Sequence, residues 1–144
     1  MQNQKGFTII ELIIVIAVIT ILASIVLINV TAYLSQSKDA AIKGNMASII
    51  SNAAAYFESN SGSYTDTAGT DTGFCGDGKF TVPLSAMTAA GSTVVQYCTP
   101  ATFCACSTLK SSTNTFCADS TGYKNETATA CATRCSDIQT TCID

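Results

Sequence analysis

The 144-residue chain contains no histidine and no tryptophan. Without histidine, the imidazole base of most acid–base catalysis and all histidine-based metal sites are excluded. Charge is also scarce, since only 12% of residues are charged, which is about half the share usual in soluble proteins. The net charge is −3 and the seven Lys and Arg residues form no cluster, so the monomer lacks the basic surface that binding to a nucleic-acid backbone requires.

The sequence also lacks a catalytic signature. Serine and threonine are abundant, but no pairing of a nucleophile with a base marks one of them as activated. We therefore expect no enzymatic activity and no cofactor.

Hydrophobic residues are concentrated in one segment near the N-terminus. Residues 12–28 are almost entirely Ile, Leu, Val and Ala, and Glu11 is the only charged side chain between Gly6 and Lys38. As a helix, residues 7–34 are long enough to cross about 30 Å of hydrocarbon. A cleaved secretory signal peptide is the alternative, but its apolar core spans only about 7 to 15 residues, and this run continues past that length.

A one-sided pattern follows the apolar segment. Apolar residues recur at helical spacing along one stripe, formed by Ile42, Met46, Ile49, Ala53 and Phe57. This spacing predicts an amphipathic helix over residues 35–58. Because no proline interrupts residues 7–58, the simplest structure is one continuous helix, and the alternative is two helices with a break at residues 35–39.

The remaining chain predicts a loop and then a small sheet. Residues 61–78 are rich in Gly, Thr and Asp, as exposed loops are. Short runs of β-branched and aromatic residues, separated by turn residues, predict strands at 79–84, 92–98, 102–109 and 115–118. The expected fold class is therefore α+β, with three or four antiparallel strands.

Eight cysteines lie beyond the apolar segment, at Cys75, Cys98, Cys104, Cys106, Cys117, Cys131, Cys135 and Cys142. An even number in a short stretch predicts disulfides and an oxidising compartment. A turn at residues 110–113 favours Cys106 with Cys117, and loop closure favours Cys75 with Cys98. We expect no metal at the cysteines, because C-x2-C pairs are absent. Calcium at Asp66, Asp71 and Asp77 is a weaker alternative to a solvated loop, since the EF-hand spacing is missing.

Residues 5–12, KGFTIIEL, followed by the apolar run, resemble the class III signal of type IV pilins and type II secretion pseudopilins. In that family a short charged leader ends in Gly, and Phe, Thr, aliphatic residues and Glu follow in this order. The resemblance covers residues 5–35 in detail. It implies a pilin fold, in which a long N-terminal helix packs on a small antiparallel sheet closed by disulfides.

The resemblance also implies a division of the chain and roles for three residues. The parts are a leader at 1–6, a transmembrane and polymerisation helix at 7–34, an amphipathic helix at 35–58 and a disulfide-rich head at 59–144. A prepilin peptidase would cut after Gly6, whose missing side chain gives a protease close access to the backbone, and Phe7 would then be N-methylated. Glu11 would act in assembly by pairing with the Phe7 amine of a neighbouring subunit, because an unpaired carboxylate among apolar helices is costly. Alternatively, Glu11 stabilises only the N-terminus of its own helix.

These inferences predict a structural subunit of an extracellular type IV pilus, serving adhesion, motility or DNA uptake. The expected partners are further copies of the chain, the prepilin peptidase, the pilus or secretion assembly machinery and, before assembly, the cytoplasmic membrane, with no nucleic acid bound by the monomer. One alternative is a type II secretion pseudopilin in a short periplasmic pseudopilus. The second alternative is a membrane-anchored cysteine-rich binding module.

Overall fold

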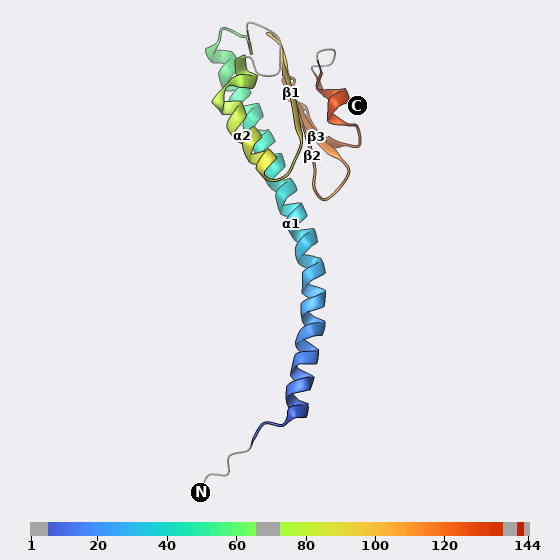
Figure 1. Ribbon diagram of the computed structural model, residues 1–144. Helices are drawn as coiled ribbons and strands as arrows, with labels where there is room; N and C mark the ends of the chain where they lie inside the picture. The colour runs from blue at the N-terminus through green and yellow to red at the C-terminus, as the bar shows by residue number, and fades with distance from the viewer. Residues whose placement is uncertain (1–5, 66–72, 137–140, 143–144) are drawn as a thin grey trace. The chain divides into compact units, whose positions relative to one another are not determined.

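The computed structural model describes residues 6–65, 73–136 and 141–142, and only the backbone of Ile28. Two compact units divide the chain, Met1–Leu34 and Ser35–Asp144. The elements in chain order are α1 (Ile9–Ser59), η1 (Gly73–Gly76), α2 (Gly78–Ala89), β1 (Val94–Cys98), β2 (Phe103–Thr108), β3 (Thr115–Asp119), β4 (Lys124–Thr127) and α3 (Cys131–Arg134) (Figure 1). The predicted α+β class with a long N-terminal helix and a small antiparallel sheet is confirmed.

Helix α1 runs without interruption from Ile9 to Ser59, so the predicted continuous helix is confirmed and the alternative break at residues 35–39 is wrong. No proline lies in this stretch, and the solvated polar residues around position 37 are compatible with a helix. The helix ends where the backbone turns left-handed, with φ of 57° at Ser61 and 78° at Gly62. The Gly62 N–H donates to the Phe57 carbonyl at 2.9 Å, which closes the last turn.

The second half of α1 supplies one wall of the main hydrophobic core. Ile42, Met46 and Ile49 are fully buried, as the stripe predicted. Phe74 of η1 lies at the centre of an aromatic group in which its ring contacts those of Tyr56, Tyr64, Phe80 and Phe103, with centroids 5.2 to 6.1 Å apart. These aromatic contacts join α1, η1, α2 and β2 in one core.

The predicted strand at residues 79–84 is wrong, because this segment forms the first half of α2. Asp77 caps the helix, with its carboxylate accepting a hydrogen bond from the Lys79 N–H at 2.7 Å. Phe80 and Met87 are fully buried on the inner face of α2, and the partly buried Leu84 packs beside them. These three residues are spaced as on one face of a helix. This spacing outweighs the strand preference of the β-branched residues between them.

Proline 83 lies inside α2, where it cannot donate to the carbonyl four residues earlier. That carbonyl belongs to Lys79, and it accepts a hydrogen bond of 2.7 Å from the side-chain amide of Asn52 on α1. The defect that Pro83 creates is thus filled from the neighbouring helix, and the same bond holds α2 against α1.

The four strands form one antiparallel sheet in the order β1-β2-β3-β4. The strands predicted at 92–98, 102–109 and 115–118 are confirmed as β1, β2 and β3, whereas β4 was not predicted. In Figure 1, α2 and the second half of α1 lie on one side of the sheet and α3 on the other. The inner face carries Phe103 and Ala105 into the main core, and the outer face carries Cys104, Cys106 and Cys117 into a second cluster.

All eight cysteines form disulfides, and three of these bonds attach the C-terminal segment to the outer face of the sheet. The pairs are Cys75–Cys98, Cys104–Cys135, Cys106–Cys131 and Cys117–Cys142. The expected Cys75–Cys98 bond is present, but the expected Cys106–Cys117 bond is wrong. These two residues do face each other across β2 and β3. Each instead pairs with a cysteine of the segment that covers their face.

Candidate functional site

The start of α1 is a reciprocal cap formed by Thr8 and Glu11. Glu11 Oε2 accepts hydrogen bonds from the Thr8 N–H at 2.9 Å and from the Thr8 hydroxyl at 2.7 Å. The Thr8 hydroxyl oxygen in turn accepts from the Glu11 N–H at 3.3 Å. This is a capping box, in which two helix-end N–H groups are satisfied by the side chains of the same turn. The carboxylate is thereby held at the N-terminal end of the helix dipole, which favours its negative charge.

The two residues of the expected cleavage site precede this cap. A Cβ atom added to Gly6 would meet no atom within 4 Å, so the space beside its α-carbon is open. Phe7 is 75% exposed. Both residues are accessible in the chain that the structure describes.

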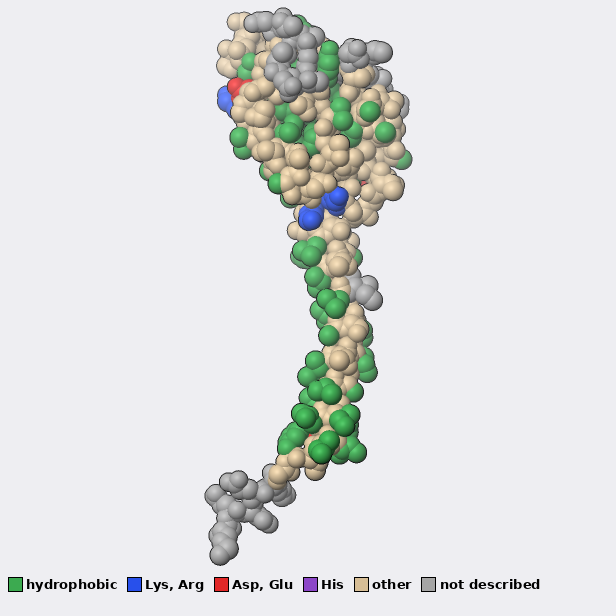
Figure 2. Space-filling view, viewed as in Figure 1, with side chains coloured by type: hydrophobic (Ala, Val, Ile, Leu, Met, Phe, Trp, Pro, Cys, Tyr) green, Lys and Arg blue, Asp and Glu red, His purple; other side chains and the backbone are tan. Residues whose placement is uncertain are grey.

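The first half of α1 is apolar around its whole circumference. Every large aliphatic or aromatic side chain described from Phe7 to Leu34 is exposed, by between 45% and 80% of its surface. Hydrophobic side chains are spread along the visible face of this segment in Figure 2. In the described part of the chain, α1 is the one helix long and apolar enough to cross a membrane. A surface of this kind is stable in lipid or against other helices.

Polar side chains inside this apolar segment bond to their own helix. The Thr20 hydroxyl donates to the carbonyls of Ala17 and Ile16 at 2.8 and 3.0 Å, and the Ser24 hydroxyl donates to the Thr20 carbonyl at 2.8 Å. Because these donors are satisfied within the helix, the segment can enter hydrocarbon without an unpaired hydroxyl proton at either residue.

In the second unit, Asp39 of α1 binds the loop between β2 and β3. Its carboxylate accepts hydrogen bonds from the N–H groups of Lys110 and Ser111 and from the Ser111 hydroxyl. Asp39 is only 5% exposed, and this burial raises its pKa, but the three hydrogen bonds and the nearby Lys43 charge outweigh burial and leave the pKa below its usual value. The carboxylate therefore stays ionised and holds the loop on the helix.

Lys43, one turn further along α1, reaches β4. Its ammonium lies 2.7 Å from Glu126 Oε2, and the amide of Asn114 donates to Glu126 Oε1 at 2.9 Å. The hydrogen bonds from Lys43 and Asn114 lower the pKa of Glu126. This contact fixes the edge strand β4 to the helix that carries the N-terminal segment.

Of the three acids in the alternative calcium site, only Asp77 lies among the described residues, and its position gives no support to that site. Asp66 and Asp71 lie outside the described residues. Asp77 is used as the N-cap of α2, where its carboxylate accepts from the Lys79 N–H.

Two features of the site were not predicted from the sequence. The capping box could have been predicted, because Thr8 and Glu11 have the T-x-x-E spacing of a capping box directly before an apolar run. The role of Asp39 carries no such local signal, since its partners lie 71 and 72 residues away along the chain.

Comparison with known protein families identifies the N-terminal segment. Residues 1–27 match the family model described as the prokaryotic N-terminal methylation motif, which is the class III prepilin signal of type IV pilins and pseudopilins. The motif implies processing by a prepilin peptidase and supports a protein similar to type IV pilins or pseudopilins. The apolar helix and this signal together fit a membrane-anchored precursor. No curated protein and no solved structure matches the chain.

Proposed function

We propose that the chain is a non-catalytic pilin, a subunit that polymerises through its N-terminal helix into an extracellular type IV pilus once residues 1–6 have been removed. The observation that carries this proposal is the combination, on one helix, of the methylation motif at residues 1–27 and an apolar surface exposed on every side. Such a surface needs a cover, which is lipid before assembly and the helices of neighbouring subunits afterwards.

Cleavage after Gly6 changes the charge at the start of the helix. It creates a cationic amine on Phe7, two residues before α1 begins at Ile9. In a bundle of such helices, the Glu11 carboxylate of one subunit pairs with the Phe7 amine of the next, which sets the stagger between subunits. Both bonds from Thr8 use Oε2 of Glu11, and a carboxylate offers further lone pairs, so the cap and the intersubunit pair can coexist.

Mass spectrometry of filaments tests the proposal. Filaments sheared from cells should contain this chain, beginning at Phe7 with one added methyl group and four disulfides. A cleaved and methylated chain that stays in the cell envelope and forms no surface filament would instead indicate a pseudopilin. An uncleaved, monomeric membrane protein that retains residues 1–6 would indicate an anchored cysteine-rich binding module and would overturn both filament readings.

A further inference from the structure

Two side chains with polar tips, Asn29 and Tyr33, lie where the aliphatic run of α1 stops. They are four residues apart on one continuous helix, so they lie one above the other on the same face. Both are exposed, Tyr33 by 73% of its surface. Tyr33 is also the one aromatic residue between Phe7 and Tyr56 in the sequence. We call Asn29 and Tyr33 the polar pair.

The polar pair differs from the hydroxyl residues deeper in the same segment. Thr20 and Ser24 donate to carbonyls of their own helix. Within the part of the chain that the structure describes, neither the side-chain amide of Asn29 nor the hydroxyl of Tyr33 makes a hydrogen bond. An amide or hydroxyl without a partner costs about 2 to 7 kcal/mol in an apolar medium. This cost excludes both groups from the middle of a bilayer and favours a layer that supplies hydrogen-bond partners.

The rise of the helix places the polar pair at a membrane boundary. Glu11 carries a carboxylate, which is costly inside hydrocarbon, so before assembly it lies at the boundary nearest the N-terminus. From Glu11 to Tyr33 the helix rises about 33 Å, or about 31 Å at a tilt of about 20°. The hydrocarbon is about 30 Å thick, and the two headgroup layers bring the bilayer to about 40 to 45 Å. Tyr33 therefore reaches the opposite headgroup layer, and Asn29, one turn earlier, lies at the inner edge of that layer.

The chemistry of the polar pair fits a layer of phospholipid headgroups. An aromatic ring with a hydroxyl group is amphipathic, and such side chains are enriched where hydrocarbon meets water. The phenol and the amide N–H groups are donors, and phospholipids present phosphate and ester carbonyl oxygens as acceptors at this depth. At the other end of the segment, Phe7 is 75% exposed, so an aromatic residue flanks the aliphatic run on either side.

We propose that the polar pair anchors the membrane-inserted chain in the headgroup layer farther from its N-terminus, by binding phosphate and ester carbonyl oxygens of phospholipids. Sliding of the helix in one direction would bury both groups in hydrocarbon, and sliding in the other would draw Glu11 into it. Glu11 and the polar pair together therefore fix the depth of the helix. This inference rests on the membrane-inserted precursor of the proposed function, but it does not depend on polymerisation.

The absence of tryptophan from the chain makes this depth measurable. Full-length Tyr33→Trp chain is inserted into phosphatidylcholine vesicles whose acyl chains carry bromine either close to the headgroup or close to the chain end, because bromine quenches tryptophan that lies near it. The fluorescence of Tyr33→Trp should be quenched at least about twofold more by shallow than by deep bromine. Leu22→Trp, in the middle of the aliphatic run, is the matched control and should show the reverse order.

The outcomes separate this inference from the proposed function. Equal or stronger quenching of Tyr33→Trp by deep bromine, or no quenching of it, would overturn the anchor if Leu22→Trp is quenched by deep bromine as expected. The membrane-inserted precursor would then still stand. Leu22→Trp that is not quenched by deep bromine would overturn both, because the helix would then not span the bilayer.

A second reporter tests whether the two polar groups set the depth. Leu34→Trp, directly after the polar pair, is measured in the wild-type background and together with Asn29→Leu and Tyr33→Leu, which replace both polar side chains by aliphatic ones. We expect the ratio of shallow to deep quenching to fall at least about twofold, since nothing then keeps this turn out of the hydrocarbon. Val26→Leu with Val30→Leu has the same spacing and removes no polar group, so it should leave the ratio unchanged. An unchanged ratio in the Asn29 and Tyr33 variant would show the proposal wrong.

Discussion

Asp39 and Ser111 are joined twice across 72 residues of sequence, since both the N–H and the hydroxyl of Ser111 donate to Asp39 Oδ2. The Lys110 N–H donates to the other oxygen at 2.5 Å. One buried carboxylate on α1 therefore holds the first part of the β2–β3 loop, at Lys110 and Ser111, in place. Its replacement leaves three donors in a partly buried position without their acceptor.

Asp39→Asn should destabilise the second unit by about 1 to 3 kcal/mol at pH 7. The pKa of Asp39 is lower in the folded chain than in the unfolded one, so its stabilisation is complete above the unfolded value of about 3.9 and is lost as the pH falls through the folded pKa. Thermal unfolding between pH 7 and pH 2 should therefore show a shallower loss of stability below about pH 4 in the variant. Glu58→Gln, an exposed acid on the same helix, is the control, and an equal change there would contradict the role of Asp39.

Glu11→Gln should abolish or strongly reduce filament formation without affecting membrane insertion or cleavage. Glutamine can replace Glu in a capping box, so this change removes the charge and keeps the cap. Thr8→Ala is the complementary variant, because it removes both hydrogen bonds of the Thr8 hydroxyl and keeps the carboxylate with its bond from the backbone N–H, at a cost of about 0.5 to 2 kcal/mol in helix stability. Filament yield in the two strains separates the roles: normal yield from Glu11→Gln cells would show that the charge is not needed for assembly.

Asn52 and Pro83 should be energetically coupled. Asn52→Ala removes the donor to the Lys79 carbonyl and should cost about 0.5 to 1.5 kcal/mol in the wild-type background. In a Pro83→Ala background the new N–H at position 83 can take this carbonyl, so the same change should cost less. A double-mutant cycle measured by chemical unfolding gives the coupling energy, and strictly additive effects would show that Asn52 does not compensate for the proline.

Reduction of the four disulfides should unfold the second unit. Each native disulfide contributes about 2 to 4 kcal/mol, and four of them in a small head outweigh its net stability. The near-ultraviolet circular dichroism of the tyrosines should be lost, while helical signal from the apolar first half of α1 persists in detergent. A head that keeps its near-ultraviolet spectrum after complete reduction would show that the core alone is sufficient.

Two glycines should respond to alanine in opposite directions. Gly44→Ala lies on an exposed part of α1 with no atom within 4 Å of the new Cβ, and it should stabilise the chain by up to about 1 kcal/mol. Gly73 has φ of 54°, and a Cβ there would lie 2.2 Å from the Tyr64 carbonyl oxygen. Gly73→Ala should therefore destabilise by more than about 2 kcal/mol, which thermal unfolding can measure.

Features with a long periodic signal could be predicted from the sequence. The apolar run and the stripe through Ile42, Met46 and Ile49 extend over many turns, and no proline opposes them, so α1 is fully determined by local pattern. The short motif at residues 5–12 identified the class III signal for a different reason, because processing enzymes recognise sequence directly.

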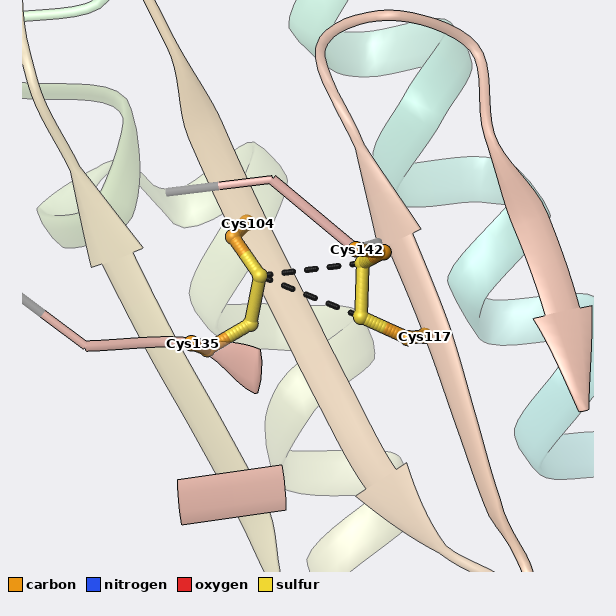
Figure 3. A group of neighbouring side chains, drawn as sticks. All are labelled: Cys104, Cys117, Cys135 and Cys142. Atoms are coloured by element: carbon orange, nitrogen blue, oxygen red, sulfur yellow. Dashed lines mark hydrogen bonds between the residues drawn. A yellow bond between two sulfur atoms is a disulfide. The ribbon is translucent and has the colours of Figure 1, made fainter. Parts of the chain in front are cut away.

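Features that depend on contacts far apart in the chain could not be predicted. Residues 79–84 contain the β-branched Thr81 and Val82, which favour a strand, and the burial of Phe80 and Met87 in the main core, at helical spacing, decides for a helix. Strand β4 contains Lys, Asn, Glu and Thr and has no apolar alternation, and it forms because Glu126 meets Lys43 and its backbone completes the sheet. Cys117 forms a disulfide with Cys142 (Figure 3) instead of Cys106 because the C-terminal segment lies over the sheet. The spacing of the cysteines along the sequence does not predict this arrangement.

The disulfide pattern also determines what a protease can remove. The Cys75–Cys98 disulfide spans residues 75–98. The other three disulfides overlap one another and together span residues 104–142. A single cut at any peptide bond inside either stretch leaves both fragments covalently joined, whereas a cut between Cys98 and Cys104 does not. Residues 99–103 are thus the one internal segment of the disulfide-bonded region where a single cut ends the covalent connection to the C-terminal 40-odd residues, and after such a cut only the β1–β2 pairing and the shared core hold the two fragments together.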